Sequence, residues 1–326
     1  MTRRLFLHLT CFINFYLVGL KTASAKNNES NLLVTTRPKS YPGHKEFRIV
    51  QPGKYFFSED QIQHGSFLDS EGNTHKPVGG MMLSILCGNV EVDFRGHTLG
   101  ADVKMGGISL SDSMNVRLAK RSSNRANSLN NRDVLLHNGT IDLARGWDTG
   151  DAIDFYNFWH GQRRRTVGRP DENDGKMIEV VYERNNYRFE RLKVLAHGVA
   201  LTAEGSHTVI RDCIIESSDL AAIFIAGNNT LIENCEIRLR KSRLRFSGPR
   251  AAIVLRDGSH AIIRNNVVRV DGGDDGEVYG ILIRDAASNI VIENNTFINT
   301  RENAINLTDD STAVIKNNKY EKKWIG

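Results

Sequence analysis

Five polar residues of this sequence could carry out chemistry on an acidic substrate. Asp154 and Tyr156 end one segment of alternating apolar residues, and Arg256 and Arg284 end two later segments of the same pattern. Two neighbouring guanidinium groups can bind a carboxylate through paired hydrogen bonds, while Tyr156 or His197 can transfer a proton. These five residues are the catalytic candidates, for a reaction that neutralises a carboxylate and removes the proton beside it. A purely structural role is the alternative for His197.

The basic residues are concentrated in two short stretches. Six lie from Arg238 to Arg250, and five lie from Arg117 to Arg132. The first stretch contains four candidates for binding an anionic ligand, which are Arg240, Lys241, Arg243 and Arg245. A local excess of positive charge favours an anionic partner, although such a run can also be a solvated surface. We expect no nucleic acid partner, because no module with interleaved basic and aromatic residues is present in the sequence.

An acidic loop and a group of aromatic residues complete the candidates. Within seven residues, three glycines accompany four carboxylates, which belong to Asp271, Asp274, Asp275 and Glu277. Such an oxygen-rich loop suits Ca²⁺, but the spacing matches no EF-hand, so a solvated acidic loop is the alternative. Three more candidates surround Asp154 as substrate-binding residues, namely Trp147, Trp159 and His160. The tryptophans could stack on sugar rings or form the apolar underside of their loops.

A repeated pattern must position these residues. A six-residue motif recurs five times. It consists of an aliphatic residue, any residue, Asn or Asp, Asn or Cys, any residue and an apolar residue. The final residues of this first motif are Ile215, Ile237, Val268, Phe297 and Tyr320, at intervals of 22, 31, 29 and 23. A second motif of four residues alternates with the first. It consists of a small residue, an apolar residue, any residue and an apolar residue, and it lies at 107–110, 152–155, 198–201, 222–225, 252–255, 280–283 and 304–307. Both motifs have the period of β-strands, so the repeat predicts the coils of a parallel β-solenoid.

Stacked coils place equivalent residues in ladders. We expect Asn266, Asn295 and Asn318 to form one ladder of inward amides, because an inward Asn at a turn can hydrogen-bond to backbone groups and to its neighbours. Cys213 and Cys235 occupy the same motif position. Side chains in a ladder point in parallel, so we predict buried thiols here in preference to a disulfide.

Strand alternation predicts which residues of the second motif face outward. Their middle positions include Ala200, Phe224, Val254 and Leu282. An apolar row of this kind does not stay bare in water. We expect it to be covered by the loops 238–250 and 270–279, or else to be a platform for a partner.

With these repeats, and with the segments Arg48–Tyr55 and Val92–Leu99, the chain resembles the right-handed parallel β-helix, pectate-lyase-like superfamily. The resemblance implies an all-β fold, a single-stranded right-handed parallel β-helix (solenoid) with three short strands per coil and loop insertions flanking one face. We place this domain at residues 45–320, between an N-terminal extension at 26–44 and a C-terminal tail at 321–326.

The resemblance also limits the functions to be considered, although this fold serves many activities. Together with the basic stretches, the candidate catalytic residues and the export signal described below, it favours an exported protein that acts on an acidic polysaccharide as a polyuronate lyase or C5-epimerase, with Ca²⁺ as a possible cofactor. The first alternative is a non-catalytic envelope or adhesive protein that binds glycan or protein through the basic stretch and the apolar row. The second is a glycoside hydrolase using Asp148, Asp151 and Asp154, but the adjacent Asp pair, Gly-His-Gly and Arg-Ile-Lys of the related hydrolases are missing here.

The first residues have the pattern of an export signal. Arg3 and Arg4 precede a mostly apolar run, and Ala23-Ser24-Ala25 matches a cleavage site. We expect a signal peptide at 1–25, whose removal lowers the formal charge from +5 to +2 and leaves no stable membrane span. The alternative is an uncleaved anchor, for which this run is short. The product would be periplasmic or extracellular, and its remaining three cysteines are too few for a disulfide framework. The sequence does not determine the oligomeric state.

Overall fold

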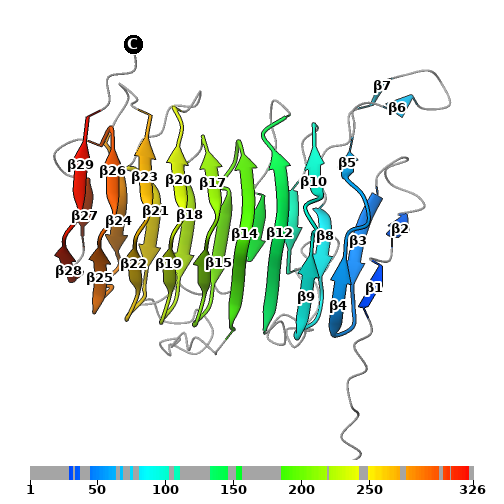
Figure 1. The fold of residues 1–326 in the computed structure, drawn as a ribbon, viewed down its shortest axis with the longest axis horizontal. Helices are drawn as coiled ribbons and strands as arrows, with labels where there is room; N and C mark the ends of the chain where they lie inside the picture. Colours follow the sequence, from blue (N-terminus) through cyan, green and yellow to red (C-terminus); the bar gives the residue numbers. More distant parts are fainter. Residues whose placement is uncertain are drawn as a thin grey trace, which may run out of the picture.

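The computed structural model describes residues 29–31, 34–36, 45–63, 67–68, 74–75, 81–102, 106–110, 133–145, 152–155, 185–218, 220–241, 249–271, 277–300, 304–308 and 310–322. These residues form a stack of coils in which each coil adds strands beside those of the coil before it (Figure 1). In the described residues, no helix is long and apolar enough to cross a bilayer. The expected signal peptide lies outside them.

One ten-stranded sheet forms a first side of the stack. Seven of its strands, from β11 onward, correspond to the seven copies of the second sequence motif, and its strands pair in parallel, except that β2 is antiparallel to β3. They are β2 (Val34–Thr36), β3 (Lys45–Ile49), β8 (Met81–Ile85), β11 (Gly106–Ser109), β13 (Ile153–Phe155), β15 (Leu201–Glu204), β18 (Ala221–Ala226), β21 (Arg250–Arg256), β24 (Val278–Arg284) and β27 (Ile305–Leu307).

A seventeen-stranded sheet forms the other two sides, with a bend in each coil between a second and a third strand. The second strands are β4 (Gly53–Phe56), β9 (Val90–Asp93), β16 (Val209–Arg211), β19 (Leu231–Glu233), β22 (Ile262–Arg264), β25 (Ile290–Glu293) and β28 (Ala313–Lys316), with β1 (Glu29–Asn31) added on β4. The third strands are β5 (Gln61–Gln63), β10 (Thr98–Ala101), β17 (Ile214–Ser217), β20 (Glu236–Leu239), β23 (Val267–Val270), β26 (Thr296–Ile298) and β29 (Lys319–Glu321). The long strands β12 (Val134–Leu143) and β14 (Tyr187–Ala196) span both sides, and β6 (Phe67–Leu68) and β7 (Thr74–His75) form a separate hairpin.

The bend between second and third strands explains the first sequence motif. The Asn or Asp at its third position has a positive φ of 54° to 56° in all five repeats, a conformation that these residues tolerate better than most. The next residue points inward, and the predicted ladder is confirmed there. Asn266 donates to Asn295 and Asn295 donates to Asn318, each with Nδ2 to Oδ1 distances of 3.0 Å. The amides thereby fasten successive coils to one another.

Cys213 and Cys235 continue this column as buried, unpaired thiols, which confirms the prediction against a disulfide. Their sulfur atoms lie 3.1 Å and 3.2 Å from the carbonyl oxygens of Arg211 and Glu233. A hydrogen bond to Cys213, together with burial, raises the pKa of the Cys235 thiol. Both groups are therefore structural.

One repeat lies two residues away from its expected position. The strand predicted at 198–201 is β15, in which Leu201 pairs with Ile153 and Ile223. Its outward middle residue is Thr202, so the assignment of Ala200 to that position is wrong. The second inward residue of this strand is Ala203, whose side chain is small. The motif requires two apolar residues, and the larger Val199 and Leu201 fit it better, so the motif was assigned two residues too early.

An alternating row of charges crosses the outer face of the seventeen-stranded sheet. In strand register it reads Asp93, His137, Glu190, Arg211, Glu233, Arg264, Glu293 and Lys316. Neighbours in the row form ion pairs, such as Arg211 to Glu190 at 2.8 Å and Arg264 to Glu233 at 2.7 Å. This face is therefore neutralised from within the chain.

Candidate functional site

The structure separates the catalytic candidates into two places. His197 directly follows β14, and Arg240 and Lys241 follow β20, so these three lie at the edge where the strands of the ten-stranded sheet begin. Arg256 and Arg284 are the last residues of β21 and β24, at the opposite edge. The five predicted catalytic residues thus do not form a single site.

The structure describes no side chain for several of the predicted site residues. The backbone of Asp154 lies in β13, three strands from Val254 of β21 in the register of the sheet, which is about 14 Å at the usual strand spacing. The other such residues lie outside the described part of the chain, namely Trp147, Tyr156, Trp159, His160, Arg243, Arg245, Asp274 and Asp275.

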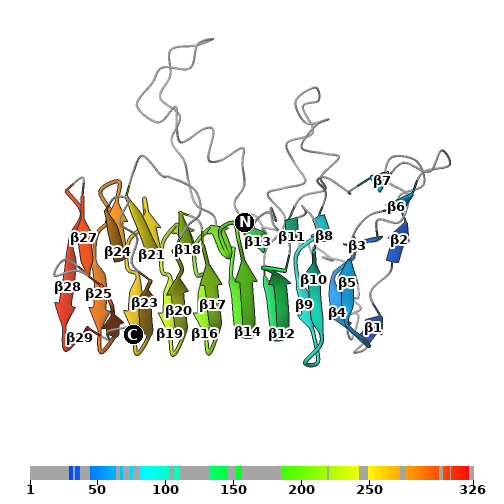
Figure 2. The same ribbon diagram turned by 90° about the horizontal axis from the view of Figure 1, so that it is seen from above.

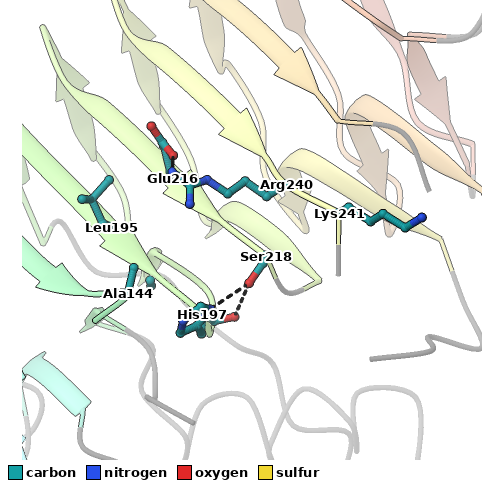
Figure 3. Close-up of a pocket in the computed structure, with 8 residues that line it drawn as sticks. Ala144, Leu195, His197, Glu216, Ser218, Arg240 and Lys241 are labelled. Atoms are coloured by element: carbon teal, nitrogen blue, oxygen red, sulfur yellow. Dashed lines mark hydrogen bonds and ion pairs between the residues drawn. The ribbon is translucent and has the colours of Figure 1, made fainter. Parts of the chain in front are cut away.

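A pocket of about 150 Å³ lies at the first edge. It is lined by Ala144, Leu195, Ala196, His197, Glu216, Ser218, Arg240 and Lys241, which come from four successive coils (Figure 3). The imidazole Nδ1 of His197 lies 3.3 Å from Ser218 Oγ, and this hydroxyl also lies 3.4 Å from the carbonyl oxygen of His197. Three residues predicted from the sequence, His197, Arg240 and Lys241, are therefore brought together here.

The segment that carries His197 is held by the stack. Ser217 is fully buried and donates from Oγ to the carbonyl oxygen of Gly198 at 2.7 Å. The carbonyl oxygens of Val199 and Ala200 accept from the backbone of the preceding coil at 3.2 Å and 3.0 Å. His197 therefore stands on a fixed turn, as a proton-transferring group requires.

The described part of the first basic stretch is largely neutralised by the chain. Arg240 forms an ion pair with Glu216 of the preceding coil, and Figure 3 shows these side chains directed at each other. Arg238 contacts Asp271 at 2.7 Å, and Arg250 is buried. Lys241 has no carboxylate partner among the described residues, and its ammonium is directed away from His197 and Ser218, at the rim of the pocket (Figure 3). The stretch thus contributes less free positive charge than its composition predicts.

A carboxylate of the chain itself occupies the expected clamp at the opposite edge. Arg256 and Arg284 are paired in register, and Asp285 forms an ion pair with Arg256 and lies 3.6 Å from Arg284. Asp285 follows β24 with a φ of 63°, which turns its side chain back towards the two guanidinium groups. A substrate carboxylate would have to displace it.

Two residues of the predicted apolar row on the outer face of the ten-stranded sheet are buried. Val254 and Leu282 are only 3% and 2% exposed and pack with Ala221, Ala251 and partly buried neighbours in a second apolar cluster. The burial expected for this row is thus confirmed at Val254 and Leu282, which are not an open platform, while most of the loops expected to cover them lie outside the described residues. On the same face, the corrected register adds two buried polar residues, Thr202 and Glu204.

The predicted calcium site is not supported by the residues that the structure describes. Asp271 is engaged by Arg238, and Glu277 accepts a hydrogen bond from the Tyr279 hydroxyl at 2.9 Å. Among the described residues, no three His, Cys, Asp or Glu side chains form a cluster that could hold a metal ion. A Ca²⁺ site therefore stays a prediction that depends on Asp274 and Asp275.

Sequence reasoning missed Glu216, Ser218, Glu204 and Asp285. Glu216 could have been found as an acidic residue on an outward strand position one coil before the basic stretch. Ser218 carries no such signal, because its role depends on how the turn after β17 lies against the turn after β14.

The family described as right handed beta helix region matches residues 178–325. A search of the curated proteins finds no match. Similar solved structures include the enzymatically active domain of bacteriophage CBA120 tailspike protein 2, at 10% identity and a TM-score of 0.45 over 84% of this chain and 38% of that one. Another is the A-module of an Azotobacter vinelandii mannuronan C-5 epimerase, at 10% identity and a TM-score of 0.33 over 83% and 76%. The surface protein and adhesin PfbA of Streptococcus pneumoniae gives 11% identity and a TM-score of 0.29 over 86% and 85%. The chain thus spans well under half of the tailspike domain, and the family match with the strand order confirms the predicted fold.

Proposed function

We propose that this right-handed parallel β-helix protein binds an acidic polysaccharide across the edge formed by His197, Ser218, Arg240 and Lys241, and acts on it there as a lyase or C5-epimerase. The observation that carries the proposal is the pocket in which a histidine and a serine meet beside a cationic rim. Pockets of this kind on rigid scaffolds are the usual places for ligand chemistry.

Ser218 supports a base at His197. A hydroxyl has one hydrogen, and Ser218 can give it to the carbonyl oxygen of His197, which lies 3.4 Å away. Nδ1 of the imidazole, 3.3 Å from the same oxygen, then donates its own hydrogen to Ser218. In this tautomer Nε2 has the free lone pair, so Nε2 is the atom that would accept the proton beside the substrate carboxylate.

Two cations at this edge would neutralise the polymer. Lys241 and Arg269 have no carboxylate partner in the described part of the chain, and Arg269 lies beside Arg238 in register. A carboxylate-bearing chain lying across the coils could pair with Lys241 while one residue enters the pocket. The Arg256 and Arg284 pair is not needed for this mode, and Asp285 already forms an ion pair with Arg256 and lies 3.6 Å from Arg284.

The test combines binding and turnover with alginate, polygalacturonate and glycosaminoglycans, with and without Ca²⁺. Unsaturated products are followed by absorbance and C5 inversion by NMR. His197→Gln should lose turnover and keep its affinity, whereas Lys241→Ala should weaken binding about 5-fold, the effect of one exposed ion pair.

Two variants serve as matched controls. His260 is an exposed histidine whose Nδ1 also contacts a serine hydroxyl, that of Ser259 at 3.0 Å, so His260→Gln should leave turnover unchanged. Lys193→Ala removes an exposed lysine from the outer face of the seventeen-stranded sheet. Full turnover in His197→Gln would reject the assignment of the base, and binding without any turnover would reject the enzymatic part of the proposal. Failure to bind any of these polymers would reject it entirely.

The same proposal places the protein outside the cytoplasm, where such polymers occur. It is supported by the pattern of Arg3, Arg4 and the apolar run that follows. Sequencing the N-terminus of protein recovered from the periplasm or medium should give Lys26 as the first residue.

A further inference from the structure

A row of apolar residues lies beside the row of alternating charges on the outer face of the seventeen-stranded sheet. Along each second strand it stands two residues before the charged row, and in strand register it reads Val209, Leu231, Ile262, Val291 and Val314. Both rows point outward, since the residues between them are 0% exposed at Ile210, Ile232, Ile263 and Ile292. Ile262 and Val314 are 36% and 57% exposed, and the other three are partly exposed. A continuous apolar row of this kind indicates a contact surface.

The charged row limits the kind of partner that this face can bind. From Glu190 to Lys316 its sign changes at every strand, so charges of the same sign are two strands apart, or about 10 Å at the usual strand spacing. A polymer of a single sign, such as an acidic polysaccharide, would meet as many repulsive groups as attractive ones. An extended peptide places the side chains of one face about 7 Å apart and does not follow this interval. A second stack of the same coils repeats the interval at every position.

The charged row is also complementary to its own reverse. A two-fold axis that runs parallel to the strands, between β19 and β22, brings a second copy onto this face with the order of its strands reversed. Each carboxylate then lies opposite a cation of the second copy, and the facing pairs are Glu233 with Arg264, Glu293 with Arg211 and Glu190 with Lys316, each twice. The ion pairs within each row are kept, and each charged group gains a further neighbour of opposite sign.

The same axis places the two apolar rows against each other. Leu231 lies opposite Ile262 of the second copy, and Val209 lies opposite Val291, each contact again occurring twice. Sheets that pack face to face stand about 10 Å apart, a distance that two such layers of side chains fill. One axis therefore satisfies both the apolar and the charged row.

We propose that this face of the second strands is a dimerisation surface, on which two copies pack apolar row against apolar row about the axis between β19 and β22. Figures 1 and 2 show the second strands β19, β25 and β28 following one another along the stack, so the two rows run along its length. The strands that form the contact, β16, β19, β22 and β25, are three or four residues long, so the contact is narrow. We therefore expect a weak dimer that depends on protein concentration.

The experiment introduces complementary charges into the central apolar contact and measures association by analytical ultracentrifugation over a range of concentrations. Leu231→Lys alone, or Ile262→Glu alone, puts an unpaired charge into both central contacts of the dimer and should weaken it at least about 10-fold. An equal mixture of the two variants should form a heterodimer, because the lysine of one copy then faces the glutamate of the other and the second contact stays apolar. The inverse pair, Leu231→Glu with Ile262→Lys, repeats the test with the signs exchanged.

Val267→Lys is the matched control. Val267 is 37% exposed, close to the value for Ile262, and it lies in β23 of the same coil, beyond the bend, so this variant should associate like the wild type. A wild-type protein that stays monomeric at every concentration would overturn the proposal, as would folded variants that still dimerise alone or that fail to associate when mixed. None of these results bears on the polysaccharide assays, because the pocket lies at the ends of β14, β17 and β20, on another edge of the coils.

Discussion

The ladder of buried amides gives a quantitative prediction for Asn295. Its side chain makes four hydrogen bonds, to Asn266 N, Asn266 Nδ2, the carbonyl oxygen of Ile263 and Asn318 Oδ1, each at 3.0 Å. The residue is 0% exposed, so water cannot replace the lost partners. At about 1 kcal/mol for each hydrogen bond, Asn295→Ala should lower the free energy of unfolding by about 4 kcal/mol.

Asn318 provides the internal comparison. It makes three such bonds, two from Asn295 and one to the carbonyl oxygen of Ile292. Because Asn318 lies in the uncovered last coil and is partly exposed, water can satisfy part of what alanine leaves open. Asn318→Ala should therefore cost about 1 to 2 kcal/mol, at most half the cost at Asn295.

Urea unfolding followed by circular dichroism measures both variants. Glu236→Ala, an exposed position on β20, is the control and should stay within about 0.5 kcal/mol of the wild type. A cost at Asn295 below about 1.5 kcal/mol, or equal to that at Asn318, would refute the view that the ladder fastens the coils through its side chains.

Two further predictions concern ionisable groups. Burial raises the pKa of Glu190, but hydrogen bonds and charges from Arg211 and Arg188 outweigh this and lower it overall. Because the folded-state pKa is depressed, the stabilisation exists in full above the unfolded value and is lost as the pH falls through the folded one. Glu190→Gln should therefore cost about 1 kcal/mol in thermal unfolding above about pH 5, and progressively less as the pH falls through the folded-state pKa. An equal cost at all pH values would contradict this sign. For the cysteines, native protein at pH 8 should be alkylated slowly at partly exposed Cys87, whose pKa burial raises, and not at Cys213 or Cys235. Mass spectrometry of the labelled peptides checks this, and rapid labelling of Cys235 would be the contrary result.

The fold could be predicted from the sequence because stacking gives equivalent residues the same surroundings in every coil. A turn that needs a positive φ and an inward hydrogen-bonding side chain therefore selects Asn or Asp followed by Asn or Cys five times. Where one residue departs from the pattern, as Ala203 does with its small side chain, the register is misread by two residues although the strand itself is found.

The site could be predicted only where it follows from position along the repeat. His197 was identified as a residue type that transfers protons, and Arg240 and Lys241 as part of a basic stretch, and the stacking of successive coils brings these turn positions together. Asp285 was not, because nothing in the local pattern shows that a residue with a φ of 63° returns its carboxylate to Arg256. Arg256 and Arg284 are neighbouring guanidinium groups as predicted, and their use as a carboxylate clamp stays a prediction in which the substrate has to displace Asp285.

The C-terminal coil shows that burial, too, depends on more than the local sequence. Ile315 and Tyr320 fit the motif as well as Ile292 and Phe297 do, and the pattern predicts that all four are buried. An inward residue is buried only when another part of a structure packs against its coil, however, and the sequence of one repeat does not predict what packs against it. The motif in Ile315–Tyr320 therefore predicts the coil and the inward direction of these two side chains, while their burial depends on what lies against the coil.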